Sequence, residues 1–236
     1  MTMMKYSSLA FVVLAAACTT SPPPSQVEFT PGTAWVMEGA GWAEEAEAVY
    51  TEATEYILAE AAQRPAKSWA VVLDLDETVM NNVQYQVERE TIGESYTSES
   101  WYDWTQRKEA TLVPGVEAFL NAVNEAGGFV AFVTNRSDSE QLATEENLAA
   151  LGLTRHDDFR ILLTRARPDG ANKKDARYDI VPGMLAAQGY ENVEVIAYLG
   201  DNVGDKPETP GEWTFFCIDQ GAMYGEACAA VPGPGL

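Results

Sequence analysis

The chain has 236 residues, with 36 acidic and 15 basic side chains and a formal net charge of −21. This length suits one α/β domain with some additions. The negative charge argues against binding to nucleic-acid polymers, because such binding depends on neutralising phosphates. The single histidine, His156, excludes mechanisms that need two histidines, and its polar neighbours favour a solvated loop residue.

The first 18 residues resemble an export signal. Lys5 provides a positive start, residues 9–17 form an apolar run, and small residues precede Cys18. The run is too short to span a bilayer. Small residues before a cysteine resemble a bacterial lipobox, in which Cys18 would be lipidated. Because Ala15 occupies the position where leucine is commonest, cleavage without lipidation stays open.

A polar, Pro-rich tether is expected over residues 19–33, ahead of one domain over residues 34–236. Thr19 after the cysteine resembles the outer-membrane pattern of Gram-negative lipoproteins. We therefore expect an exported protein, held at the outer membrane through its lipid alone, with secretion or a periplasmic location as the second choice. Cys217 and Cys228 could form a disulfide in such a protein, or Cys217 could be a buried thiol.

An N-terminal helix and a buried strand come next. Apolar side chains recur at helical spacing over residues 41–62, and Arg64-Pro65 ends that pattern. Trp69–Leu73 is a continuous apolar run, typical of a central parallel strand. The run stops at Asp74, and Asp76 follows two residues later. A buried acid at a strand end costs desolvation free energy, which indicates a function.

Residues 81–110 form a polar insertion without clear periodicity. Its aromatic side chains are Tyr85, Tyr96, Trp101, Tyr102 and Trp104. We expect most of them to pack the insertion against the domain, because aromatic side chains pack more often than they bind. One or two could instead line a substrate pocket above the strand ends, where a flat ring could stack.

The rest of the chain alternates strands and helices. Helices are expected from Pro114 to Ala126, from Ser139 to Leu151 with Leu142, Leu148 and Leu151 inward, and from Ile180 to Gln188; strands are expected over residues 129–133, 160–164, 193–199 and 213–218. This alternation predicts an α/β fold with a central parallel sheet and right-handed crossovers.

Polar side chains stand at four successive strand ends or turns: Asp74 and Asp76, then Thr134, then Lys174, then Asp201 and Asp205. Three acids in one place repel each other unless a cation lies among them. Oxygen ligands without a nearby histidine or cysteine indicate a hard ion, with Mg²⁺ the first choice. Together with a lysine, such an ion would make a seat for a phosphate dianion.

This set suits phosphoryl transfer. One carboxylate can attack phosphorus and form an aspartyl phosphate, while the metal and the lysine hold the phosphoryl oxygens. The acid two residues further on can protonate the leaving oxygen and later activate water. Its backbone carbonyl is also free to bind the metal.

The motifs DLDETV, TNR, a K-x-x-R lysine and GDN-x-x-D, in this order, resemble the haloacid dehalogenase superfamily. More narrowly, VVLDLDETVMNNVQY and FVTNR are similar to the signatures of bacterial class C acid phosphatases. The resemblance extends over roughly residues 35–225. It implies a Rossmann-like core with an N-terminal helix and a small insertion after the first strand, and Mg²⁺-dependent hydrolysis of small phosphomonoesters, including nucleoside monophosphates.

Carried over by motif, the resemblance assigns Asp74 as nucleophile and Asp76 as acid and base. It implies phosphate binding by Thr134, Asn135 and Lys174, the last preferred to Lys173. It implies metal binding by Asp74, the Asp76 carbonyl and Asp201, with Asp205 as an outer acid, and a substrate platform of Trp101 and Tyr224.

The chain departs from the family pattern after GDN, where Val203-Gly204-Asp205-Lys206 lacks an aromatic residue, and before Tyr224, where Asn-Pro is missing. These departures affect the expected substrate rather than the expected activity. The alternative function is a non-catalytic surface or storage lipoprotein on the same fold. The sequence predicts no oligomeric state.

Overall fold

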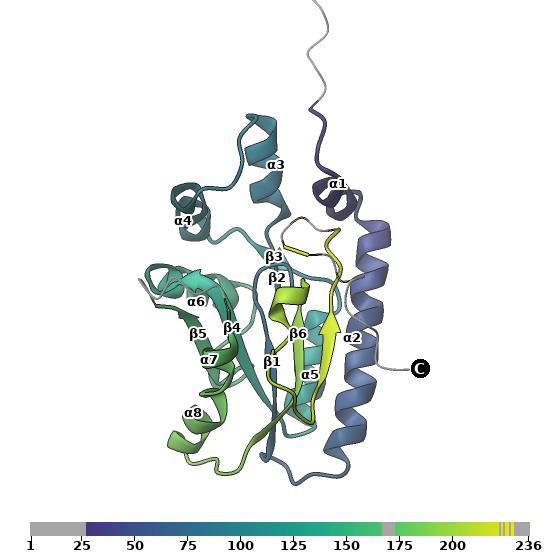
Figure 1. Ribbon diagram of the computed structural model, residues 1–236, viewed down its shortest axis with the longest axis vertical. Helices are drawn as coiled ribbons and strands as arrows, with labels where there is room; N and C mark the ends of the chain where they lie inside the picture. Colours follow the sequence, from purple (N-terminus) through teal and green to yellow (C-terminus); the bar gives the residue numbers. More distant parts are fainter. Residues whose placement is uncertain (1–26, 167–172, 222, 224, 227, 229–236) are drawn as a thin grey trace, which may run out of the picture.

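A five-stranded sheet forms the centre of the computed structural model, which describes residues 27–166, 173–221, 223, 225, 226 and 228 (Figure 1). Its strands are β1 (Trp69–Leu73), β4 (Phe129–Ser137), β5 (Ile161–Arg165), β6 (Glu194–Gly200) and β7 (Thr214–Cys217). They run in the order β5-β4-β1-β6-β7, and every neighbouring pair is parallel. The predicted α/β fold with a central parallel sheet is therefore confirmed.

Alternate residues of β1 face two separate hydrophobic clusters. Val71 and Leu73 lie in the cluster that contains side chains of α2 (Ala40–Ala61), α5 (Val116–Glu125) and α6 (Gln141–Ala150). Ala70 and Val72 lie in the cluster beneath α7 (Asp175–Tyr178) and α8 (Val181–Ala187). The strand is buried on both faces, which explains its unbroken apolar sequence.

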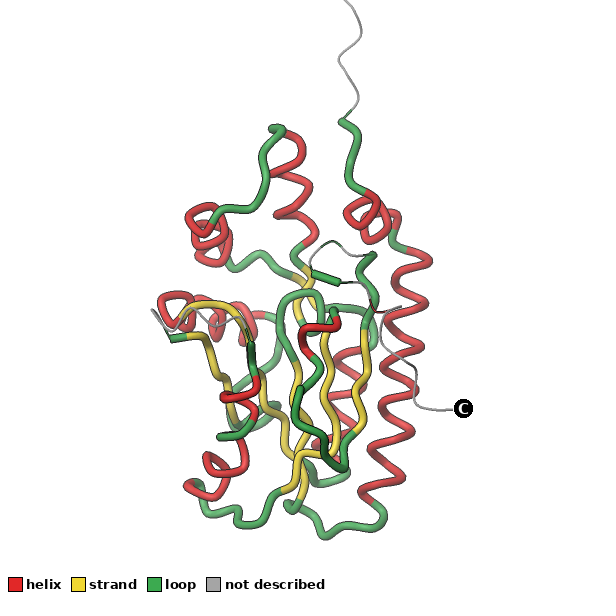
Figure 2. The backbone as a smooth tube through the Cα atoms, viewed as in Figure 1, coloured by secondary structure: helices red, strands yellow, loops and turns green. Residues whose placement is uncertain are grey.

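The insertion after β1 is built from two short helices. A two-stranded antiparallel ladder of β2 (Met80–Asn81) and β3 (Thr111–Leu112) joins it to the domain, and α3 (Val83–Thr91) and α4 (Ser98–Arg107) lie between these strands. Both helices stand beyond the carboxyl ends of the sheet (Figures 1 and 2). A capping box of Thr97 and Ser100 begins α4. Few of their residues are buried, so their sequences carry little periodicity.

The N-terminal helix α1 (Pro31–Glu38) is attached to the insertion by Glu90 of α3. Its carboxylate accepts hydrogen bonds from the Thr30 backbone N–H at 2.8 Å, the Thr30 hydroxyl at 2.8 Å and the Thr33 hydroxyl at 2.7 Å. Thr33 is fully buried. The expected tether boundary at residue 33 therefore shifts, because Pro31–Thr33 already form the first turn of α1.

Helix α6 differs from the helix predicted from Ser139 to Leu151. A 3₁₀ turn over Asp138–Glu140 precedes α6, and Leu142 is 72% exposed rather than inward. The buried face carries Thr144 and Asn147 beside Ala143 and Leu148. These polar side chains face inward because they bond buried polar groups: Asn147 pairs with the Ala110 backbone at 3.2 and 3.1 Å.

Strand β4 also extends beyond its predicted end at Val133. Its pairing with β5 is regular to Val133, shifts register, and resumes at Ser137 opposite Arg165. The residues between, Thr134–Arg136, therefore lie in an irregular stretch at the carboxyl end of the sheet. Irregular pairing of this kind redirects side chains beside functional sites.

Cys217, the last residue of β7, is bonded to Cys228 in a disulfide, with 5.5 Å between the Cα atoms. Of the two possibilities that the sequence allowed, the structure contains the disulfide. Among the helices that the described residues form, none has the length and apolar character needed to cross a bilayer.

We expect Glu90→Ala to lower the free energy of unfolding by about 2 kcal/mol, because hydrogen bonds to a charged acceptor contribute about 1.5–3 kcal/mol. Urea unfolding measures this change. Thr91→Ala is the matched control, since the Thr91 hydroxyl bonds the Val87 carbonyl within α3. Equal effects of the two substitutions would contradict an attachment of α1 through Glu90.

Candidate active site

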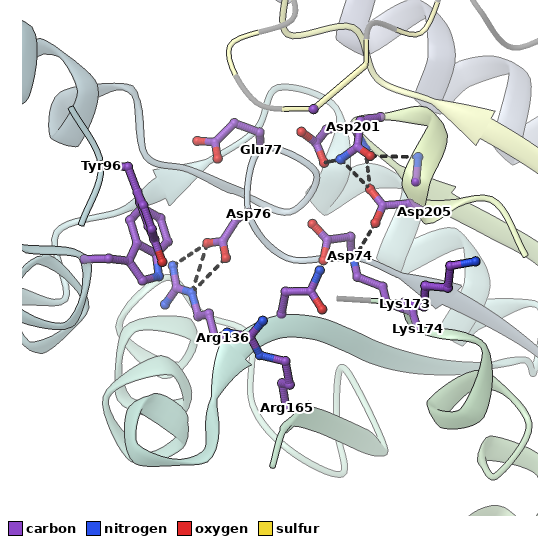
Figure 3. Close-up of a pocket in the computed structure, with 15 residues that line it drawn as sticks. Asp74, Asp76, Glu77, Tyr96, Arg136, Arg165, Lys173, Lys174, Asp201 and Asp205 are labelled. Atoms are coloured by element: carbon purple, nitrogen blue, oxygen red, sulfur yellow. Dashed lines mark hydrogen bonds and ion pairs between the residues drawn. The ribbon is translucent and has the colours of Figure 1, made fainter. Parts of the chain in front are cut away.

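The residues that the motifs single out meet around one cavity of about 560 Å³ at the carboxyl edge of the sheet. Asp74 and Asp76 follow β1, Asp201 and Asp205 follow β6, and Lys174 precedes α7. Figure 3 shows these side chains converging on the cavity from separate elements. The sheet order explains this convergence, because β1 and β6 are neighbours and both end at this edge.

Three buried carboxylates form one side of the cavity. Asp74, Asp201 and Asp205 are 3–6% exposed, and each offers an oxygen atom within 4.8 Å of the others. The ammonium group of Lys174 contacts Asp74 and lies 2.6 Å from Asp205. Lys174 is buried, whereas the neighbouring Lys173 is exposed and pairs with Glu208. The structure therefore places Lys174, not Lys173, among the acids.

Two of these carboxylates, Asp74 and Asp201, resist ionisation. Burial raises the pKa of Asp74 to about 7, against the opposing effect of Lys174. Burial and the charges of Asp205 and Asp74 raise the pKa of Asp201 well above its ordinary value. Burial alone would lower the pKa of Lys174, but Asp205 and Asp74 raise it instead, so this side chain stays protonated.

The donor set fits a hard divalent cation. Three ionised carboxylates and one ammonium group leave two negative charges in a buried space, which a divalent cation would balance. All the side-chain atoms that the three acids offer are oxygens, the ligands that Mg²⁺ prefers. Asp74 and Asp201 would hold such an ion directly, with Asp205 beside them as an outer acid.

Asp76 has a different environment. Its carboxylate oxygen Oδ1 accepts hydrogen bonds from Arg136 Nη2 at 2.7 Å, Arg136 Nε at 2.9 Å and Asn82 Nδ2 at 3.0 Å. In Figure 3 the Asp76 carboxylate points toward Arg136 and away from the other acids. Arg136 is buried and comes from the irregular end of β4. Asp74 and Asp76, two residues apart in sequence, thus have different partners: Lys174 pairs with the first and Arg136 with the second.

Asn82 connects Asp76 to the insertion. Its Oδ1 accepts from Trp104 Nε1 at 2.9 Å and from Arg136 Nη2 at 3.2 Å, and its Nδ2 donates to Asp76 and to the Met80 carbonyl. Indole and guanidinium groups only donate, while carboxylate and carbonyl oxygens only accept. The chemistry of the four neighbours therefore fixes which way the amide points. Trp104 of α4 is linked to Asp76 through one fully bonded side chain.

A family model described as "HAD superfamily, subfamily IIIB (Acid phosphatase)" matches residues 15–225. The chain belongs to this family. The structure is similar to two structures of the class C acid phosphatase from Bacillus anthracis. One, solved with tungstate bound, gives a TM-score of 0.68 at 23% identity, and the other gives 0.67 at 23%. Each match covers 82% of this chain and 84% of the Bacillus chain.

In this member of the family, the TNR motif lies in the irregular end of β4. Thr134 is fully buried, and its hydroxyl accepts from the Arg136 backbone N–H at 3.1 Å. Arg177 donates to the Thr134 carbonyl and to Asn135 Oδ1. Asn135 lines the cavity, whereas Thr134 lies behind it. Phosphate binding by Thr134 and Asn135 stays a prediction, as do the roles of the other site residues.

The insertion supplies an aromatic wall to the cavity. Trp101 and Tyr96 line it, with 6.1 Å between their ring centroids, and the guanidinium carbon of Arg136 lies 5.6 Å from the Trp101 ring centroid. Tyr85 and Trp104 are buried and pack as expected, whereas Tyr96 and Tyr102 are exposed. The second expected platform residue, Tyr224, and the expected lipidation site, Cys18, lie outside the described residues.

Three residues near the site were not predicted from the sequence. Arg136 stands inside the TNR motif and Asn82 inside the first signature, so each is adjacent to a recognised signal. Arg136 reaches Asp76 from a strand 60 residues further along the chain, and Asn82 is held beside Asp76 by its bonds to Trp104 and Arg136. Gln220, which bonds Asp201, has no sequence signal at all.

Without a divalent cation, we expect the free energy of unfolding to fall as the pH rises from 5 to 8. The Asp74 pKa is raised to about 7 in the folded protein, above an unfolded value of about 3.9. The folded protein therefore binds this proton more tightly than the unfolded chain does. The resulting stabilisation is complete below the pKa of Asp74 in the unfolded chain, and it is lost as the pH rises through the pKa of Asp74 in the folded protein. Urea unfolding in a chelator measures it.

Two additions sharpen this test. Mg²⁺ should raise the free energy of unfolding more at pH 8 than at pH 5, because the cation competes with protons for the carboxylates. Asp74→Asn should flatten the pH dependence. A wild-type stability that stays constant between pH 5 and 8 in chelator would contradict the raised pKa of Asp74.

We expect Trp104→Phe to cost about 1 kcal/mol more stability than Trp42→Phe, because only the first loses a buried hydrogen bond. Trp42 is also buried, but its Nε1 has no partner among the described residues. The two substitutions remove the same atoms, so their difference isolates the bond to Asn82. Equal unfolding midpoints would show that this bond contributes nothing.

Proposed function

We propose that the chain is a Mg²⁺-dependent phosphomonoesterase that works through an aspartyl phosphate on Asp74. One observation carries this proposal: a member of an acid phosphatase family has three buried carboxylates around one lysine, in a cavity at the carboxyl edge of a parallel sheet. The tungstate in the Bacillus structure also supports it, because tungstate is a tetrahedral oxyanion like phosphate.

Substrate binding follows from the charge balance. Asp74, Asp201 and the carbonyl of Asp76 would hold Mg²⁺, with Asp205 behind them, and the ion would offset negative charge on the phosphoryl group. Lys174 would offset a further charge from the other side, since it lies between Asp74 and Asp205. Asn135 lines the cavity next to these groups and can donate to a phosphate oxygen through its backbone or side chain.

In the first chemical step, an ionised oxygen of Asp74 forms a bond to phosphorus as the bond to the leaving oxygen breaks. The leaving oxygen takes a proton from the carboxyl group of Asp76. Arg136 and Asn82 hold Oδ1 of this group, while Oδ2 has a single, longer contact to Arg136 Nε at 3.2 Å. We assign the proton transfer to Oδ2, because it has fewer hydrogen-bond partners than Oδ1.

In the second step, Asp76 accepts a proton from water as the water oxygen attacks phosphorus and the bond to Asp74 breaks. Inorganic phosphate is released, and both carboxyl groups return to their starting states. Asp74 and Asp76 can divide the two roles because Lys174 and the other acids surround the first, and Arg136 and Asn82 hold the second.

Small phosphomonoesters are the proposed substrates, with nucleoside monophosphates as a subset. The aromatic wall of Tyr96 and Trp101 faces the same cavity as the acids, so a flat base or aryl group could rest against it. Comparison of rates on p-nitrophenyl phosphate and on adenosine monophosphate separates broad hydrolysis from a 5′-nucleotidase. We also propose export and lipidation at Cys18, which mass spectrometry of the mature N-terminus tests.

We expect Asp74→Asn to lower kcat for p-nitrophenyl phosphate on the order of 10⁴-fold or more, because the nucleophile is lost. Asp103→Asn, on the exposed face of α4, is the matched control. A chelator should abolish wild-type activity and Mg²⁺ should restore it. Wild-type protein that releases no phosphate in Mg²⁺ would instead favour the alternative, a non-catalytic surface or storage lipoprotein.

A further inference from the structure

The segment that follows β7 lies against the turn that carries Asp201 and Asp205. Gln220 is fully buried, and its Nε2 donates a hydrogen bond of 3.1 Å to Asp201 Oδ2. The Glu226 carbonyl accepts from the Val203 backbone N–H at 3.3 Å. Gly225 approaches Asn202 so closely that a Cβ atom on it would lie 3.1 Å from the Asn202 side chain. The described part of this segment thus contacts the turn at several points.

The segment is held from two other sides. The disulfide joins Cys228 to the end of β7, and Cys228 Sγ lies 3.6 Å from the Asp201 carbonyl oxygen. On the outer side, Gly32 of α1 packs against the backbone of Met223, where an added Cβ would come within 2.8 Å of the Met223 nitrogen. Both contacts restrict the positions that the segment can take.

Asp201 depends on this segment for its orientation. Its Oδ1 accepts from Asn202 Nδ2 at 3.1 Å, and its Oδ2 accepts from Gln220. Asn202 is the next residue in the chain, so it moves with Asp201. Gln220 is 19 residues away in sequence and reaches Asp201 only when the segment is in place. Hydrogen bonds to a metal-binding carboxylate fix its direction and tune its affinity for the ion.

We propose that Gln220 is a positioning residue for Asp201 as a cation ligand, and that the Cys217–Cys228 disulfide maintains this contact. Reduction of the disulfide then weakens divalent-cation binding. The inference rests on the cation site of the proposed function, and it adds a dependence on the oxidation state of two cysteines that are not themselves ligands.

The conformational entropy of the segment explains why the disulfide would keep Gln220 in contact with Asp201. Bonding Cys217 to Cys228 closes a loop with a sequence separation of 11, which removes many alternative conformations of the chain. Dithiothreitol supplies two electrons and two protons, so the S–S bond breaks to two thiols while the reagent becomes a cyclic disulfide. The freed segment then spends less time with Gln220 against Asp201.

The first experiment measures cation binding, not turnover. Isothermal titration of the metal-free full-length protein with Mn²⁺ should give a Kd about tenfold higher for Gln220→Met than for the wild type, because loss of such a partner costs about 10–100-fold in affinity. Gln188→Met, on an exposed position after α8, is the matched control and should leave the Kd unchanged. An unchanged Kd for Gln220→Met would overturn the proposal.

The second experiment tests the disulfide. Dithiothreitol should raise the wild-type Kd for Mn²⁺ about tenfold, once alkylation and peptide mapping confirm that Cys217 and Cys228 are reduced. The double variant Cys217→Ser, Cys228→Ser should bind as weakly as the reduced wild type and should not respond to dithiothreitol. A reduced wild type with an unchanged Kd, and an intact circular dichroism spectrum, would overturn the proposal.

One further variant separates failure of this inference from failure of the proposed function. Asp201→Asn should abolish tight Mn²⁺ binding whatever the state of the disulfide. If it leaves binding unchanged, the cation site itself is wrongly assigned. If it abolishes binding while Gln220→Met and reduction have no effect, the cation site is correct and only the positioning role of Gln220 is wrong.

Discussion

Three buried carboxylates lie together with one ammonium group that pairs with only two of them, and most features of the site follow from this imbalance. Lys174 contacts Asp74 and Asp205 but leaves Asp201 with amide partners alone. Burial of like charges is unfavourable, because the carboxylates repel each other. Contacts from several elements of the fold are therefore needed to keep them in place. The central strands, the turn after β6, the segment after β7 and α7 all contribute to that support. Such buried like charges lower the stability of the fold, as is common at functional sites.

The strands of the core could be predicted from the sequence, because the burial of each strand determines how its apolar residues are spaced. Strand β1 is apolar at every position since both faces are covered, and each of the five strands begins within one residue of its predicted start. The acids at the strand ends were equally visible, because a polar residue directly after a buried run is conspicuous. Local patterns suffice where a residue's neighbours along the chain determine its environment.

The remaining features depend on contacts between distant residues. Leu142 was expected inward by helical spacing, yet Thr144 and Asn147 take the buried face because each satisfies a polar partner from another element. The helices of the insertion are short and mostly exposed, so they lack the periodicity that reveals longer helices. Arg136 and Gln220 join the site through pairings with residues distant in sequence, and Asn82 is oriented there by Trp104 and Arg136.

The insertion is fixed at both ends and along its length. Glu90 attaches α3 to α1, Trp104 attaches α4 to Asn82, and Lys108 pairs with Glu146 of α6 at 2.6 Å. We expect a segment anchored in this way to act as a fixed wall rather than as a hinged lid. We therefore expect a preformed opening of the cavity between Tyr96, Trp101 and the turn after β6, which would limit the leaving groups that can enter. Evolution of a new preference would proceed by changing the side chains on that rim, one at a time, with no adjustment of a closing motion.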